Sequence, residues 1–138
     1  MLTRMKLLLL ALCLITSGLA AEVAQLTPQA AAKLVAEGKA VLVDVREPTE
    51  WAETGVAAPA VLLPKSEFDA GLIGAWKDFL AKTGNKQIIL YCRSGKRAGA
   101  LGAALAEKGF TVANAGGFQD WADAKLPTRK ITPAPAKP

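Results

Sequence analysis

The residues best suited to chemistry lie in one short segment that combines a thiol, a glycine and three cations. In chain order, its members are Cys92, Arg93, Ser94, Gly95, Lys96 and Arg97. Amides at the start of a helix, or fixed positive charges, favour the ionised thiolate, which is the nucleophilic form of cysteine. Gly95 allows the loop to curl so that successive amides point inward and form an anion-binding concavity. The segment therefore predicts that Cys92 is a nucleophile and that the other five residues bind an anionic substrate.

Two of these assignments have an alternative. Arg93, Lys96 and Arg97 either line the mouth of the site and attract an oxyanion, or brace the loop as structural charges. Cys92 itself could be a buried structural cysteine, since free cysteines are among the most buried residues. Its position between an apolar run and a basic, glycine-containing loop favours the reactive interpretation.

The flanking residues predict a strand before this segment and a helix after it. Residues 87–91 form a short apolar run with β-branched and aromatic members, which is typical of a buried strand. Residues 98–108 are rich in alanine and leucine and stop at Gly109, a typical residue just beyond a helix end. Cys92 is therefore expected at the first loop position after a strand, where parallel α/β sheets bind ligands.

Short apolar strands alternate with helices along the rest of the chain. The predicted strands cover residues 22–26, 40–45, 60–64, 87–91 and 110–114. The predicted helices cover residues 28–37, 46–55, 66–82, 98–108 and 118–124, and the third has a break suggested by Gly71 and Gly74. This alternation predicts an α/β fold, with a parallel sheet of about five strands and helices on both faces.

Composition divides the chain into three segments. Residues 1–20 carry two positive charges, an apolar run and then small residues, which is the pattern of a secretory signal peptide. Residues 21–127 are the predicted domain, and residues 128–138, rich in proline and lysine, are predicted to be a disordered tail. We therefore expect export, most simply to a bacterial periplasm, and no stable membrane insertion after the signal is cleaved.

Composition also argues against several kinds of site and partner. The chain has no histidine, which removes Cys–His and Ser–His–Asp activation and makes a zinc site improbable. After signal cleavage Cys92 is the only cysteine, so no internal disulfide is expected. The net charge of +5 comes from the two ends, because residues 21–126 hold twelve basic and twelve acidic residues. We therefore expect no metal, no cofactor and no nucleic-acid partner.

Three motifs together resemble those of the rhodanese-like sulfurtransferase family. Residues 92–97 resemble its active-site loop, Cys-Arg-x-Gly followed by two variable positions. Residues 43–48 are similar to its Asp-x-Arg segment, and residues 116–121, followed by Leu-Pro, are similar to its closing motif. The motifs occur in the family's order and span nearly all of the predicted domain. The resemblance therefore implies a single rhodanese-like domain.

The resemblance also implies a mechanism. Cys92 would attack the sulfane sulfur of thiosulfate or a similar small anionic donor, release sulfite and hold the sulfur as a persulfide. Cyanide or a thiol would then accept that sulfur. Asp44 and Arg46 are expected to form a structural ion pair that supports the loop. The alternative is a non-catalytic rhodanese-like module that carries sulfur or binds a partner.

Two differences from known patterns bear on this resemblance. Protein tyrosine phosphatases and related arsenate reductases place an arginine six positions after the cysteine, where this chain has Ala98 and carries Arg97 one residue earlier. The shorter loop suits a persulfide better than a phosphoryl group. Residues 55–60 read Gly-Val-Ala-Ala-Pro-Ala, whereas the family usually has Gly-His-Ile-x-Gly-Ala. The link to the third strand therefore departs from the family's pattern.

Overall fold

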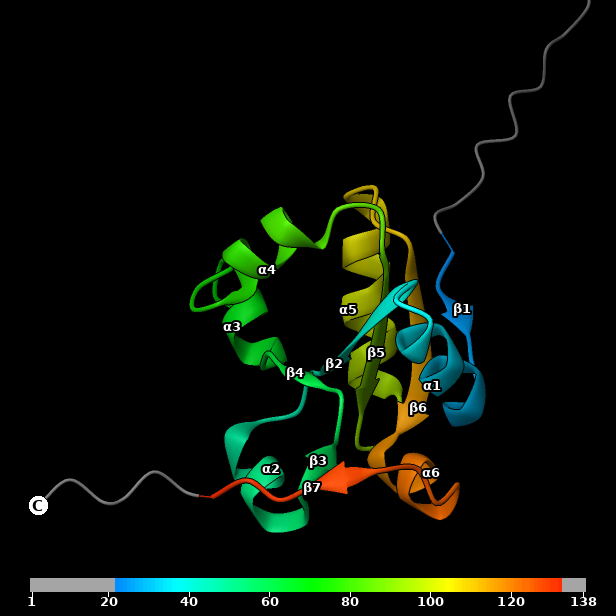
Figure 1. The fold of residues 1–138 in the computed structure, drawn as a ribbon. Helices are drawn as coiled ribbons and strands as arrows, with labels where there is room; N and C mark the ends of the chain where they lie inside the picture. Colours follow the sequence, from blue (N-terminus) through cyan, green and yellow to red (C-terminus); the bar gives the residue numbers. More distant parts are fainter. Residues whose placement is uncertain (1–21, 133–138) are drawn as a thin grey trace, which may run out of the picture.

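Five parallel strands form the central sheet of the protein, whose computed structural model describes residues 22–132 (Figure 1). In spatial order, they are β1 (Ala24–Gln25), β6 (Val112–Gly117), β5 (Gln87–Cys92), β2 (Ala40–Asp44) and β4 (Val61–Leu62). Every neighbouring pair is parallel. The predicted α/β fold with a five-stranded parallel sheet is therefore confirmed. The strand β5 lies at its centre, as expected for a continuous apolar run that is covered on both faces.

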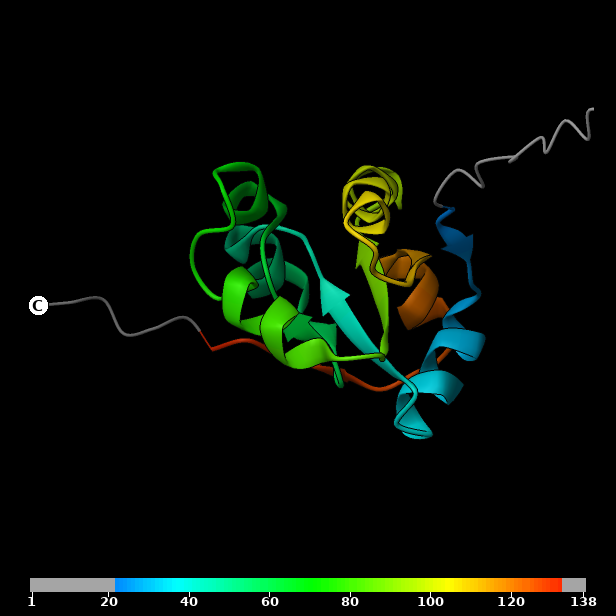
Figure 2. The same cartoon turned by 90° about the horizontal axis from the view of Figure 1, so that it is seen from above.

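Two hydrophobic cores lie on opposite faces of this sheet. Successive side chains of β5 alternate between the two cores, because neighbouring residues of a strand point to opposite faces. The helices that contribute to them are α4 (Trp76–Thr83) and α5 (Lys96–Glu107) on one face, and α1 (Pro28–Ala36) and α6 (Phe118–Asp123) on the other. Figure 2 shows α5 and α1 on opposite sides of the strands. Helices therefore cover both faces, as predicted.

Local signals place several helix ends where the sequence predicts them. The helix α1 begins after Thr27, whose Oγ1 accepts a hydrogen bond from the Ala30 amide at 3.1 Å. The predicted break in the third helix separates α3 (Lys65–Asp69) from α4. Gly71 and Gly74 lie in this break at φ values of 106° and 64°, which glycine adopts without strain.

The predicted disordered tail starts too early. Thr128–Arg129 forms the strand β7, which pairs in antiparallel fashion with β3 (Val56–Ala57). The Arg129 guanidinium also donates a hydrogen bond to the Ala60 carbonyl at 3.0 Å. The prediction used local composition alone, whereas the partner strand is distant in sequence and lies in the segment that departs from the family pattern. The predicted start of the tail is therefore wrong, and residues 133–138 lie outside the described residues.

The predicted signal peptide, residues 1–20, also lies outside the part of the chain that the structure describes. Export and cleavage therefore stay predictions. Among residues 22–132, none of the helices combines the length and the apolar character needed to cross a bilayer.

Candidate active site

Cys92 ends the central strand β5, and its side chain is fully buried. The Gly95 amide donates a hydrogen bond to the Cys92 Sγ at 3.0 Å. Gly95 has a φ of 89° and caps the N-terminus of α5, so the predicted turn of the loop at this glycine is confirmed. The sulfur thus lies beside a backbone donor at the positive end of a helix, an environment that stabilises anionic sulfur.

The loop itself is shorter than predicted. Cys92 is not its first residue, because it still pairs with Gly117 of the neighbouring strand β6. The helix α5 begins at Lys96, two residues before the predicted start. Only residues 93–95 therefore connect strand to helix, and this tight connection brings the helix N-terminus to the sulfur.

Asn114, a buried residue of β6, holds the loop from the side. Its Nδ2 donates a hydrogen bond to the Gly95 carbonyl at 2.8 Å, and its Oδ1 accepts one from the Gly116 amide at 2.9 Å. Gly117 faces the Arg93 carbonyl so closely that a Cβ atom at this position would collide with it. The closing motif therefore packs directly against the loop. Asn114 was not among the predicted site residues, although its place near the end of a strand adjacent to β5 is a usable signal.

Arg97 is paired with Glu50, a residue of α2 (Pro48–Thr54) that the sequence analysis did not identify as part of the site. The Arg97 Nη1 and Nη2 atoms each lie 2.7 Å from one carboxylate oxygen of Glu50. Glu50 also accepts a hydrogen bond from the Glu47 amide at 2.9 Å. The hydrogen bonds from Arg97 lower the pKa of Glu50 to about 2, against the opposing effect of burial, and the same pairing raises the pKa of Arg97. The bracing role of Arg97 therefore has direct structural support, while its role toward substrate stays a prediction.

Asp44 and Arg46 form the predicted ion pair, and both side chains are buried. The Arg46 Nη2 and Nε atoms donate to Asp44 at distances from 2.7 to 3.1 Å. Arg46 also donates to the Thr54 hydroxyl at 2.9 Å, and its guanidinium lies 4.6 Å from the centre of the Phe118 ring. Burial lowers the pKa of Arg46, but the hydrogen bonds and the charge of Asp44 together outweigh this effect. The pKa of Arg46 therefore lies above its ordinary value. This pair joins the end of β2 to α2 and to the start of α6.

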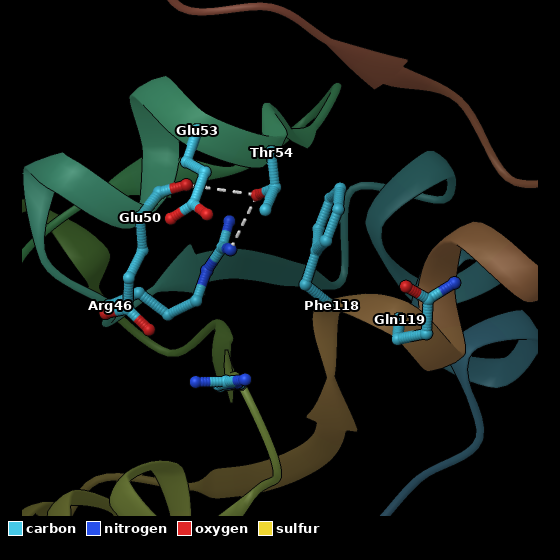
Figure 3. Close-up of a pocket in the computed structure, with 7 residues that line it drawn as sticks. Arg46, Glu50, Glu53, Thr54, Phe118 and Gln119 are labelled. Carbon is cyan, nitrogen blue, oxygen red and sulfur yellow. Dashed lines mark hydrogen bonds between the residues drawn. The ribbon is translucent and has the colours of Figure 1, made fainter.

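A cavity of about 250 Å³ opens beside the loop (Figure 3). The residues that line it are Arg46, Glu50, Glu53, Thr54, Arg93, Phe118 and Gln119. Cys92 is not among them, but it directly precedes Arg93, and its strand partner Gly117 directly precedes Phe118. The cavity therefore lies beside the loop that follows Cys92, while the buried thiol itself does not line it.

The predicted site residues of the loop do not all face the cavity. Of the three loop cations, only Arg93 lines the cavity, while Lys96 and Ser94 are exposed. The cavity residues from α2 and α6 were not among the predicted site residues either, because their proximity depends on long-range packing. Among residues 22–132, no cluster of three or more cysteine, aspartate or glutamate side chains could hold a metal ion.

Comparison with a family model supports the resemblance. The model of the rhodanese-like domain matches residues 27–124, which is most of the chain. The chain belongs to the rhodanese-like domain family. Its Cys-Arg-x-Gly loop, the buried ion pair and the closing motif all fall inside the matched range. No curated protein sequence shows significant similarity to the chain.

Solved structures support the same fold. The polysulfide-sulfur transferase homodimer of Wolinella succinogenes has 28% identity and a TM-score of 0.63, with 83% of each chain covered. Reduced Bacillus anthracis CoADR-RHD has 28% identity and a TM-score of 0.58, over 72% of this chain, which spans only 16% of that longer protein. The rhodanese-like domain and the Wolinella transferase together support sulfur transfer as the general activity.

A third structure bears on the phosphatase alternative. The protein RPA3614 from Rhodopseudomonas palustris, described as a possible tyrosine phosphatase, has 22% identity and a TM-score of 0.65, over 78% of this chain and 85% of its own. At this identity, the likeness concerns the fold alone. In this rhodanese-like domain, the position six residues after Cys92 is Ala98, which is fully buried in the core. The phosphate-gripping arginine of the Cys-x5-Arg pattern is therefore absent from that position.

Proposed function

We propose that this protein is a sulfurtransferase that carries sulfane sulfur on Cys92 as a persulfide. The observation that carries the proposal is the Gly95 amide, 3.0 Å from the Cys92 Sγ at the N-terminus of α5. A backbone donor and a helix N-terminus stabilise the thiolate before transfer and the anionic persulfide after it. The cycle needs no cofactor, because cysteine sulfur is the nucleophile in one step and the leaving group in the next.

In the first half-reaction, the Cys92 thiolate attacks the sulfane sulfur of thiosulfate. A bond forms between Sγ and that sulfur, the sulfur–sulfur bond of thiosulfate breaks, and its electron pair leaves with sulfite. Charge is conserved, and no external oxidant or reductant takes part. Arg93 lines the adjacent cavity and offers positive charge to the dianionic donor. The similarity to a polysulfide-sulfur transferase supports polysulfide as a second candidate donor.

In the second half-reaction, cyanide or a thiolate attacks the outer sulfur of the persulfide. The bond between Sγ and the outer sulfur breaks, and Cys92 leaves as a thiolate. We propose a thiol as the cellular acceptor, whereas cyanide serves as the assay acceptor.

Both steps require a path to a thiol that is fully buried in this structure. Arg93 and Ser94, which directly follow Cys92, are exposed and belong to the short loop. We therefore propose that the loop moves when a donor binds.

The first experiment is the thiosulfate:cyanide sulfurtransferase assay on residues 21–138 beside Cys92→Ala. We expect turnover that vanishes in the variant, together with a one-sulfur mass increase on the wild-type protein after thiosulfate exposure. A one-sulfur adduct without turnover would favour the carrier alternative. Failure of both thiosulfate and polysulfide to modify reduced, folded protein would contradict the proposal.

The cellular location that we propose is the bacterial periplasm, since residues 1–20 have the pattern of a signal peptide. Fractionation of cells that express the full chain tests this proposal. Recovery of the shortened chain in the periplasmic fraction would support it, and recovery of the full-length chain in the cytoplasm would contradict it.

A further inference from the structure

Four charged side chains line the cavity beside the loop, and two of them are already neutralised. The Arg46 Nη2 lies 2.7 Å from the Asp44 Oδ2. The Glu50 Oε1 lies 2.7 Å from the Arg97 Nη2. Each of these cavity residues therefore meets an opposite charge inside the protein. Neither offers a full uncompensated charge to a ligand.

The other two, Arg93 and Glu53, make no ion pair with any residue between 22 and 132 that the structure describes. Arg93 follows the nucleophile directly, whereas Glu53 comes from α2; Figure 3 shows Glu53 beside Glu50 and Thr54 on that helix. The cavity thus presents one uncompensated cation and one uncompensated anion. An anionic donor such as thiosulfate is attracted by the charge of Arg93 but repelled by that of Glu53.

We propose that the sulfur acceptor at this site is a small thiol that carries both a carboxylate and an ammonium group, that is, a thiol amino acid. Arg93 binds its carboxylate and Glu53 binds its ammonium group. This inference rests on the proposed sulfurtransferase function and specifies its acceptor. Glu53 thereby becomes a specificity residue that favours zwitterionic over purely anionic thiols.

The size of the cavity agrees with a ligand of this class. Its volume of about 250 Å³ lies below the roughly 300–1,000 Å³ typical of pockets for drug-sized ligands. Phe118 supplies an apolar wall, one side of which is covered by the Arg46 guanidinium. A molecule of amino-acid size therefore fits better than a long peptide thiol.

The transfer step balances without a further reagent. The acceptor thiolate attacks the outer sulfur of the anionic Cys92 persulfide, and a new sulfur–sulfur bond forms. The bond between that sulfur and Sγ breaks, and its electron pair stays on Cys92 as a thiolate. The negative charge of the outer sulfur leaves with the product, which is the persulfide of the thiol amino acid.

The test separates loading from discharge. The full chain is loaded with thiosulfate, or with polysulfide if thiosulfate fails, and excess donor is removed. Discharge of the persulfide is then followed by mass spectrometry with four probe thiols: cysteine, cysteamine, 3-mercaptopropionate and 2-mercaptoethanol. Each thiol is compared between protein variants, so its own reactivity cancels.

We expect Glu53→Gln to slow discharge by cysteine and cysteamine about 3- to 5-fold, the effect of one exposed ion pair. Discharge by 2-mercaptoethanol should stay unchanged. Arg93→Gln should slow discharge by cysteine and 3-mercaptopropionate but spare cysteamine. Glu107→Gln removes an exposed glutamate at the end of α5 and is the matched control.

The outcomes distinguish the two proposals. Equal effects of Glu53→Gln on all four thiols, or no effect on any, would overturn the acceptor inference while loading still succeeds. Failure of the wild-type chain to load with either donor would overturn the sulfurtransferase function itself, and the acceptor inference with it.

Discussion

Arg97, in the first turn of α5, and Glu50, in α2, meet through two hydrogen bonds of 2.7 Å although they lie 47 residues apart in the sequence. This pair joins α5, the helix that follows Cys92, to α2, whose residues line one side of the cavity. The Arg97 guanidinium thus stabilises the position of the loop. Arg93 is left as the loop cation that lines the cavity.

Removing the Glu50–Arg97 pair should lower the free energy of unfolding only slightly. It should, however, release the contact that holds α5 and the adjoining loop against α2. In a double-mutant cycle with Glu50→Gln and Arg97→Gln, we expect a coupling energy of about 0.5–1 kcal/mol, since both side chains are partly exposed. Urea denaturation measures this energy, and the rate of persulfide formation should fall in both single variants. Lys108→Gln, at the exposed end of α5, is the control. Strict additivity of the two single variants would contradict the pairing.

The same pair should make stability depend on pH in the acid range. Because the pKa of Glu50 is lowered from 4.5 to about 2 in the folded protein, the unfolded chain binds more protons between these values. The contribution of Glu50 is therefore fully present above pH 4.5 and is lost as the pH falls toward 2. The difference in unfolding free energy between the wild type and Glu50→Gln should shrink across this window. A difference that is constant between pH 6 and pH 2.5 would refute the assignment.

Breaking the buried Asp44–Arg46 pair should lower the free energy of unfolding far more than breaking the Glu50–Arg97 pair. The variant Asp44→Asn leaves the Arg46 charge buried and uncompensated, for which we expect a loss of about 3–5 kcal/mol in unfolding free energy. The matched control is Asp69→Asn, which breaks the exposed pair with Lys65 and should cost less than about 1 kcal/mol. Similar losses in the two variants, measured by chemical denaturation, would show that burial does not set the energy of the Asp44 pair.

Asn114 should position the loop that follows Cys92 through one specific hydrogen bond. The variant Asn114→Asp keeps the acceptor for the Gly116 amide but removes the donor to the Gly95 carbonyl. The Gly95 carbonyl keeps its hydrogen bond from the Gly99 amide, so we expect a loss of about 0.5–1.5 kcal/mol in stability, the net contribution of one hydrogen bond, and slower persulfide formation. Asn85→Asp, in an exposed turn, is the control. Unchanged loading kinetics in Asn114→Asp would contradict a positioning role.

The sequence alone determined the strand, the short loop and the helix around Cys92, because these depend on neighbouring residues. Apolar runs predict buried strands, and a glycine such as Gly95 allows the positive φ that the turn from β5 into α5 requires. The ion pair of Asp44 and Arg46 was also accessible, since its members are two residues apart. For the same reason, the placement of Cys92 between a buried strand and a helix N-terminus could be predicted.

Only the tertiary structure decided which distant residues complete the site. Glu50, Asn114 and Phe118 reach the loop because α2, β6 and α6 converge at the carboxyl end of the central strands. The pairing of β7 with β3, which joins Arg129 to a segment near residue 60, likewise has no local signal. Such contacts depend on how both faces of the sheet are covered, and no short window of sequence contains both partners. Local sequence therefore identified Cys92, and long-range packing determined which charged residues lie near its loop.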